Sequence, residues 1–81
     1  MSVIKEQLSV CVVHQRSNAE LTQEALAAKA DLSSRHIQDI EAAKKMAKVD
    51  TVFQLSYALD VDYKTLLQPA WDQWLADKSS K

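Results

Sequence analysis

The sequence contains no glycine and only one proline in 81 residues. Glycine averages about 7% of the residues in soluble domains, and it supplies the positive φ angles that the tightest β-hairpin turns require. A fold built on β-hairpins is therefore unfavourable for this chain. Helices joined by short polar breaks remain, and we predict one all-α domain, which buries about 60% of the surface of its unfolded chain.

Cysteine and long apolar runs are also nearly absent. The one cysteine, Cys11, cannot form an intramolecular disulfide and is interpreted as a small core residue, with redox sensing as the alternative. The longest uninterrupted apolar stretch, VCVV at 10–13, is too short to span a membrane. The first residues, MSVIKEQLS, lack the features of a signal peptide. We therefore expect a soluble, cytoplasmic protein.

Neither sign of charge dominates the chain. A net charge of −1 argues against a protein that coats nucleic acid through bulk positive charge. The distribution is uneven, because residues 29–48 hold five basic and three acidic residues, whereas residues 49–81 hold three lysines and five aspartates. Positive charge is thus concentrated in the middle of the sequence.

Apolar residues recur at helical spacing along the chain. The pattern predicts helices over about 2–17, 22–30, 33–43 and 49–60, a short fifth helix that begins at Asp62, a sixth that begins at Pro69, and a polar tail at 77–81. The residues expected on the inner faces of the first four helices are Ile4, Leu8, Cys11, Val12, Leu26, Ala27, Ala30, Ile37, Ile40, Val49, Val52, Phe53, Leu55, Ser56 and Leu59.

Polar residues mark the ends of these helices. Thr22 and Ser33 are expected to cap the second and third helices, since a hydroxyl can accept a hydrogen bond from a free N–H of the first turn. Asn18 is expected to end the first helix, because asparagine tolerates the left-handed conformation. Asp31 and Leu32 remain as a tight turn, so that residues 22–43 form a helix, a turn and a second helix.

The stretch LTQEALAAKADLSSRHIQDIEAAKK, followed by VDTVFQLSYALDVDYKTLL, resembles the Xre/Cro-type helix-turn-helix domain of phage repressors and bacterial regulators. The spacing carries the resemblance, with LTQE opening the first motif helix, small residues at Ala27 and Ala30, and Ile37 and Ile40 three apart. It implies a five-helix, lambda-repressor-like domain over residues 1–67, with an extra C-terminal helix and tail over 68–81 that serves packing or dimerisation. The size also resembles, more weakly, the controller proteins of restriction–modification systems.

The resemblance implies that residues 33–43 form the recognition helix, which lies in the major groove with its N-terminal half toward the base edges. Gln23 matches a residue that typically clamps a phosphate, and Lys44 and Lys45 match the connector that follows the DNA backbone. The DNA-binding residues implied in this way are Gln23, Ser33, Ser34, Arg35, His36, Gln38, Asp39, Lys44 and Lys45.

Several of these residues have competing interpretations. Arg35 can bond guanine O6 and N7 together, worth about 1–3 kcal/mol of discrimination, or form an exposed ion pair with Asp39, worth a few tenths of a kcal/mol. Asp39 can accept from cytosine N4, or orient Arg35 and reject wrong sequences, which would sharpen specificity while weakening affinity. His36 can contact DNA or be solvated, and Glu41 matches a family acid that is usually structural.

The chain departs from the family pattern at positions where glycine is common. The residues at these positions are Glu20, Asp31, Ala43 and Asp60. Left-handed backbone at these sites would cost roughly 1–2 kcal/mol for each non-glycine residue, less for aspartate. Met46 and Ala47 stand where asparagine and proline are common, so the phosphate contact of that asparagine is not carried over to Met46.

Low net charge predicts modest non-specific DNA binding, so we expect a homodimer on a palindromic operator with half-site centres roughly 34 Å apart. The apolar residues after the motif favour an interface there, with at least one tryptophan in or beside it. The alternative is that both tryptophans pack on their own core. The residues expected in dimerisation are Tyr63, Leu67, Trp71 and Trp74.

These observations predict a nucleoid-associated, sequence-specific transcriptional regulator that acts as a repressor or an activator. The alternative is an antitoxin-like or adaptor module that uses the same fold to bind a protein, such as a toxin or RNA polymerase. Ser33, His36 and Asp39 are not a catalytic triad, because they lie on the exposed side of a short helix without an oxyanion hole. Cys11, His14 and His36 lack ligand spacing. We expect no enzyme activity, metal, cofactor or small-molecule ligand.

Overall fold

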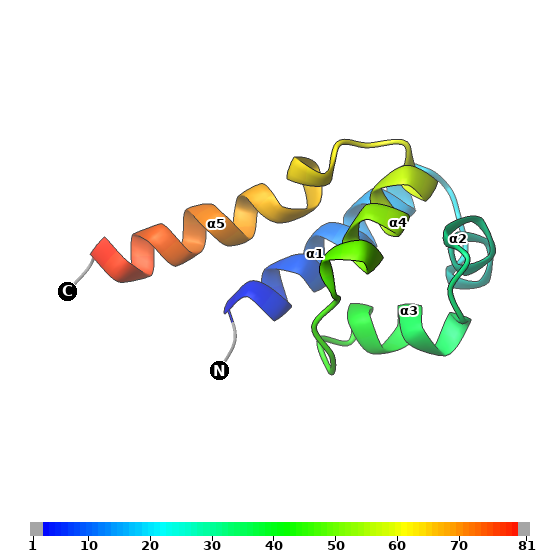
Figure 1. Cartoon of the computed structure of the whole chain (residues 1–81), viewed down its shortest axis with the longest axis horizontal. Helices are drawn as coiled ribbons and strands as arrows, with labels where there is room; N and C mark the ends of the chain where they lie inside the picture. The colour runs from blue at the N-terminus through cyan, green and yellow to red at the C-terminus, as the bar shows by residue number, and fades with distance from the viewer. Residues whose placement is uncertain (1–2, 80–81) are drawn as a thin grey trace.

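The computed structural model describes residues 3–79, which form five α-helices and contain no strand. In chain order they are α1 (Val3–Asn18), α2 (Gln23–Ala30), α3 (Ser34–Glu41), α4 (Val49–Leu59) and α5 (Tyr63–Ser79) (Figure 1). The predicted all-α fold is confirmed. The expected helix start at Ser2 and the end of the polar tail at 80–81 lie outside the described residues. No helix within residues 3–79 is long and apolar enough to cross a membrane.

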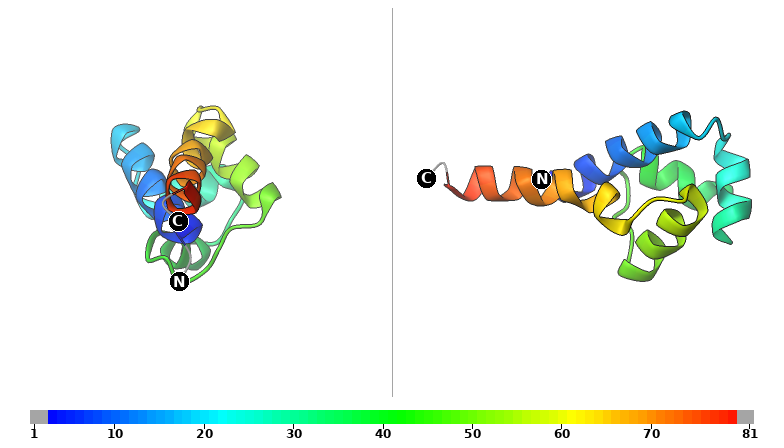
Figure 2. Two further views of the ribbon diagram at one scale, coloured as in Figure 1. Left: turned by 90° about the vertical axis from the view of Figure 1, so that its left-hand side faces the viewer. Right: turned by 90° about the horizontal axis from the view of Figure 1, so that it is seen from above.

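The helices pack around α1 and α4. Helices α2 and α3 contact each other, α3 also packs on α1, and α4 lies against α2 and α5. Helix α5 packs on α1, and its C-terminal end extends beyond the other helices (Figures 1 and 2). The chain is consequently elongated, with principal extents of 42 × 23 × 21 Å.

The core draws side chains from all five helices. Its largest fully buried members are Leu8, Val12, Leu26, Ile37, Ile40, Leu55 and Leu66. The inner faces predicted for α2 and α3 are confirmed. The inner face of α1 is narrower than predicted, because Ile4 is 39% exposed and Cys11 is half-buried at the edge of the core.

The buried face of α4 differs in part from the prediction. Its buried residues are Thr51, Val52, Leu55, Ser56, Ala58 and Leu59. The expectation that Val49 and Phe53 face the core is wrong, because they are 70% and 51% exposed. At 100° per residue, both lie on one flank of the helix, next to the exposed Tyr57. The apolar pattern of α4 is therefore wider than the surface that its neighbours cover.

The C-terminal segment is one helix instead of two. Residues 63–79 are helical throughout, so the predicted break at Pro69 is wrong. A proline inside a helix removes one hydrogen bond and costs about 3 kcal/mol. Leu66 and Ala70 are buried on either side of it, and Leu67 packs against the core. This burial holds both halves of the helix on the same surface and offsets the cost.

Within residues 3–79, four non-glycine residues have left-handed backbone. They are Glu20, Asp31, Ala43 and Asp60, with φ between 58° and 59°. All four are the sites where the family commonly has glycine, and Asp31 and Asp60 cap the C-termini of α2 and α4. Helix α1 ends at Asn18 as predicted, but Glu20 takes the left-handed conformation instead of the asparagine. The chain adopts glycine-type turns without glycine.

Candidate nucleic-acid interface

Helices α2 and α3 form a helix-turn-helix unit that is fixed by caps at each helix start. Thr22 accepts a hydrogen bond from the N–H of Ala25 at 3.0 Å, which caps α2. Ser33 accepts from the N–H of His36 at 3.1 Å, which caps α3. Both predicted caps are confirmed. Between the two helices, Leu32 packs against the core, so the turn is anchored and the orientation of α3 is set.

One side of α3 is buried, and the opposite side is open to solvent. Ile37 and Ile40 face the core. Arg35 lies on the open side, with 79% of its side-chain surface exposed. The other predicted contact residues on or beside this side are Ser34 and His36, which are half-buried, and Gln38, which is exposed.

Asp39 is nearly buried although it points away from the core. Its side chain is 10% exposed, and its carboxylate pairs with two basic residues. Arg35 Nε donates to Oδ1 at 3.3 Å, one helical turn earlier on α3. Lys45 Nζ, from the connector between α3 and α4, lies 3.7 Å from Oδ2. The anticipated Arg35–Asp39 pair is present, and Lys45 is an additional partner.

Glu41, at the end of α3, joins three helices through its carboxylate. Arg16 on α1 donates from Nε to Oε2 at 2.7 Å and from Nη2 to Oε1 at 3.1 Å. Gln23, the first residue of α2, donates from Nε2 to Oε1 at 2.9 Å. Ser9 on α1 donates from its hydroxyl to the carbonyl of Glu41. The hydrogen bond to Glu41 raises the pKa of the Arg16 guanidinium, so the guanidinium stays charged.

Gln23 is held at the N-terminus of α2 by this network. Its side-chain nitrogen carries two hydrogens, and the bond to Glu41 uses one of them. The second hydrogen and the free N–H groups of the first turn of α2 remain for an anion at the helix start. The assigned role of Gln23 as a phosphate contact is compatible with this geometry.

The connector after α3 carries the exposed lysines. The N–H of Lys44 donates to the carbonyl of Asp39 at 2.9 Å, and Ala43 adopts its left-handed conformation just before it. Ala47 is buried and anchors the far end of the connector. Lys44 and Lys45 are therefore presented from a loop that is fixed at both ends.

The four predicted dimerisation residues lie in two groups. Tyr63 contacts Phe53 edge to face, with ring centroids 5.7 Å apart. Trp71 and Trp74 stack in parallel at 5.6 Å. Leu67 and both tryptophans line an apolar groove between α5 and the start of α1, and the full lining is Ile4, Leu67, Ala70, Trp71 and Trp74. The tryptophans are 54% and 41% exposed, so neither is fully packed into the core.

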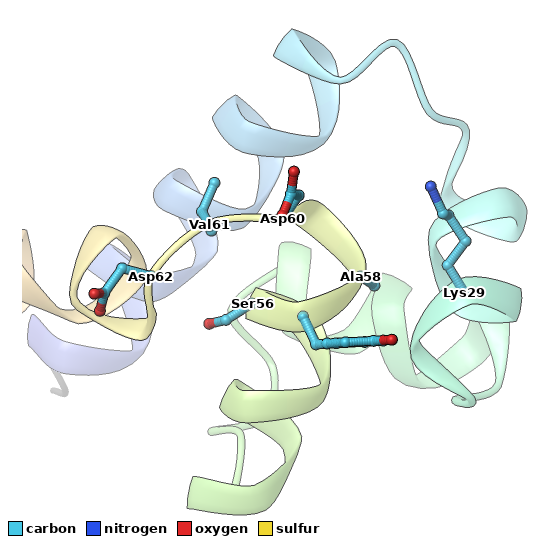
Figure 3. A pocket seen from close by; sticks show the side chains of 7 residues that line it. Lys29, Ser56, Ala58, Asp60, Val61 and Asp62 are labelled. Atoms are coloured by element: carbon cyan, nitrogen blue, oxygen red, sulfur yellow. The ribbon is translucent and has the colours of Figure 1, made fainter.

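A second hollow lies at the turn between α4 and α5, with Lys29 of α2 on its other side (Figure 3). It is open and measures about 800 Å³, and Asp60 and Asp62 lie along the turn. The hydroxyl of Ser56 is already bonded to the carbonyl of Val52 at 2.8 Å. Residues 3–79 contain no group of three side chains suited to hold a metal ion.

Sequence reasoning missed Arg16. The residue lies outside the quoted motif, and nothing in its own neighbourhood distinguishes it from a solvated basic residue at the end of a helix. The sequence feature that could have indicated such a residue was Glu41, because a structural acid on the inner edge of α3 requires a basic partner. Only the fold shows that α1 supplies that partner.

The helix-turn-helix family model, HTH_3, matches residues 15–66, more than half of the chain. No curated protein sequence is significantly similar to the chain. Solved structures give the same fold. The restriction-modification controller protein C.AhdI from Aeromonas hydrophila has a TM-score of 0.76 at 21% identity, covering 78% of this chain and 96% of its own.

Two further structures are similar over most of their length. The clp gene regulator ClgR from C. glutamicum has a TM-score of 0.78 at 18% identity, covering 86% of this chain and 91% of its own. A mutant of the restriction-modification controller protein C.Esp1396I has a TM-score of 0.77 at 20% identity, covering 90% and 95%. At these identities, the similarity establishes the fold.

Proposed function

The chain belongs to the helix-turn-helix family that its residues 15–66 match, and on this premise we propose that it is a transcriptional regulator that binds a palindromic DNA operator as a homodimer. The family is one of DNA-binding regulators and not of enzymes. Two of the structures with a similar fold are restriction–modification controller proteins, and we propose the same specific role for this chain.

The open side of α3 is the observation that carries the proposal. The helix directs Ile37 and Ile40 into the core and extends Arg35 into solvent from a position fixed by the cap at Ser33. A helix presented in this way fits the major groove, where an arginine can bond both acceptors of a guanine. We assign base contacts to the open side, with Arg35 as the principal reader.

Phosphate contacts are assigned to the two ends of the motif. Gln23 lies at the N-terminus of α2, where N–H groups point outward and favour an anion. Lys44 and Lys45 lie on the connector after α3 and are exposed. Contacts on both sides of the recognition helix would fix its register in the groove without reading sequence.

The apolar groove on α5 supports the homodimer. A monomer seldom exposes neighbouring large apolar side chains, and tryptophan is enriched at interface centres. Trp71 and Trp74 are both exposed and stacked on each other, so they form a rigid apolar surface. A two-fold contact there would pair two recognition helices and compensate for the low net charge.

Selection of binding sites from random DNA by the full chain tests the proposal. We expect enrichment of a palindrome whose half-site centres are about 10 base pairs apart. Enrichment of a single half-site would contradict the homodimer. Recovery of no common sequence at low salt would contradict sequence-specific binding.

A second candidate, the antitoxin-like or adaptor module, is favoured by the flank of α4. Val49, Phe53 and Tyr57 recur every four residues and are all more than half exposed. Such a stripe fits an apolar protein surface, which in this reading belongs to a toxin or to RNA polymerase. Co-expression with the product of an adjacent gene distinguishes the two functions, because an adaptor forms a stable complex that Phe53→Ser disrupts and that needs no DNA.

A further inference from the structure

One nearly buried carboxylate holds two of the cations that are assigned to DNA. Oδ1 of Asp39 accepts from Arg35 Nε at 3.3 Å, and Oδ2 lies 3.7 Å from Lys45 Nζ. The side chain of Asp39 is 10% exposed, whereas those of Arg35 and Lys45 are 79% and 69% exposed. Either cation can therefore swing away from the protein, but the carboxylate cannot follow it.

The backbone of Asp39 also sets the position of Lys45. Its carbonyl accepts the N–H of Lys44 at 2.9 Å and that of Lys45 at 3.4 Å, which closes the turn after α3. Arg35 lies one helical turn before Asp39 on the same face. Asp39 thus joins two segments with different assigned roles. The face of α3 is assigned to base reading, and the connector is assigned to phosphate contact.

We propose that Asp39 couples these two contacts by letting one cation leave it for a DNA phosphate, but not both at once; this inference rests on the DNA-binding function proposed above. An ionised carboxylate in a nearly buried position is strongly unfavourable without a partner, and one remaining cation is enough to compensate it. On the operator, Lys45 moves to a phosphate. Arg35 keeps Nε on Asp39 and directs its two terminal nitrogens at a guanine.

On unrelated DNA the same restraint limits affinity. No guanine is in place to accept hydrogen bonds from the terminal nitrogens, so Arg35 could add to the binding affinity only by moving to a phosphate. That move would leave Asp39 without a cation, because Lys45 is already on the backbone. Asp39 therefore limits the complex with unrelated DNA to one phosphate contact fewer than the two cations could make. In this way Asp39 is a positioning residue that increases specificity without touching DNA.

The salt dependence of binding tests this coupling, measured with the full chain on the selected operator and on unrelated DNA of equal length. Each phosphate contact adds about 0.9 to the slope of log affinity against log salt. Asp39→Asn preserves size and frees Arg35. We expect the slope on unrelated DNA to steepen by about one, and the ratio of operator to unrelated affinity to fall about fivefold. Adding Arg35→Ala should remove the extra slope.

Asp31→Asn is the matched control. It removes one exposed negative charge from the turn before α3, and asparagine tolerates the left-handed backbone of that position. The control should leave the affinity ratio and both slopes unchanged. The coupling is overturned if Asp39→Asn behaves as the control does, or if it shifts both DNAs equally. Failure to select any operator would instead overturn the proposed function.

The wild-type chain provides a measurement that does not depend on the folding of a variant. Under the coupling, Arg35 Nε–H stays hydrogen-bonded to Asp39 when unrelated DNA is bound. Its NMR signal should therefore exchange more slowly with water in both complexes than in the free chain, where Lys45 can hold Asp39 alone. Fast exchange of Arg35 Nε–H on unrelated DNA would overturn the proposal even if Asp39→Asn did not fold.

Discussion

Glu41 on α3 receives two hydrogen bonds from the guanidinium of Arg16 on α1, at 2.7 and 3.1 Å. The side chain of Glu41 is 6% exposed and that of Arg16 is 19% exposed, so the pair is largely removed from water. The same carboxylate accepts from Gln23, which begins α2. One acid thus fixes the proposed recognition helix on the two helices that precede it.

Removing the charge of Glu41 should therefore destabilise the fold. Glu41→Gln leaves the Arg16 guanidinium largely buried without a carboxylate, and breaking a pair of this kind costs about 3 kcal/mol. Urea unfolding of the variant should show this loss. Glu24→Gln, an exposed acid in the first turn of α2, is the control and should change stability by less than about 0.5 kcal/mol. Equal effects of the two substitutions would show that the pair contributes no net stability.

Ala43→Gly should stabilise the chain. Ala43 has φ 58°, and an alanine in this conformation costs roughly 1–2 kcal/mol that glycine avoids. After the entropy that glycine loses on folding, a gain of about 1 kcal/mol remains, which raises Tm by about 4–8 °C in a domain of this size. Ala42→Gly, at φ −86°, is the neighbouring control and should lower Tm. A lower Tm for both variants would contradict the strain at Ala43.

Cys11 should react slowly with alkylating reagents. Burial raises the pKa of its thiol, because the thiolate is the charged form and loses hydration there. A raised pKa lowers the thiolate fraction at neutral pH, and the thiolate is the nucleophile. Alkylation by iodoacetamide at pH 7 should therefore be slower in the folded chain than in the same chain unfolded in urea. Equal rates would contradict the burial of the thiol and reopen redox sensing.

The fold was most predictable from the sequence where the local apolar pattern and the tertiary packing agree. The spacing of apolar residues in α2 and α3 leaves little choice of inner face. Thr22 and Ser33 carry hydroxyls directly before these helices, so both helices and both caps were predictable. The left-handed sites were predictable only through the family, because Glu20 and Ala43 have no intrinsic preference for positive φ.

The remaining differences come from tertiary contacts that a local pattern does not contain. Pro69 is an ordinary helix start in isolation, and only the burial of Leu66 and Ala70 on either side explains its place within α5. Phe53 matches an inner position of α4 but lies beyond the surface that its neighbours cover. In the candidate site, the second partner of Asp39 was unpredictable, because Lys45 reaches it only through the connector turn.

Arg35→Ala should abolish sequence preference while leaving the fold intact. The side chain is 79% exposed, so its removal affects stability little, but it takes away the only side chain on the open face that can bond both acceptors of a guanine. Binding to the selected operator should weaken by about 1–3 kcal/mol more than binding to unrelated DNA, which has no guanine contact to lose. Competition titrations with the two DNAs measure the difference. Unchanged operator affinity would reject α3 as the recognition helix.

Lys45→Ala should act differently from the arginine variant. A phosphate contact carries no sequence information, so the loss should be similar on operator and unrelated DNA. The slope of log affinity against log salt should fall by about one on both. Titrations at several salt concentrations give this slope. A change confined to the operator would show that Lys45 reads bases instead.

Trp74→Ala should weaken the proposed dimer. The ring stacks on Trp71 and lines the apolar groove with Ile4 and Leu67, and truncating an aromatic residue at an interface centre costs about 2 kcal/mol or more, roughly 30-fold in dimer Kd. Light scattering across the micromolar range should follow the shift toward monomer. Tyr57→Ala is the control, because this aromatic side chain is 86% exposed on α4 and should leave the dimer intact. A wild-type monomer at high micromolar concentration, unchanged by Trp74→Ala, would place both tryptophans on the surface of a monomer and leave the palindromic operator without a basis.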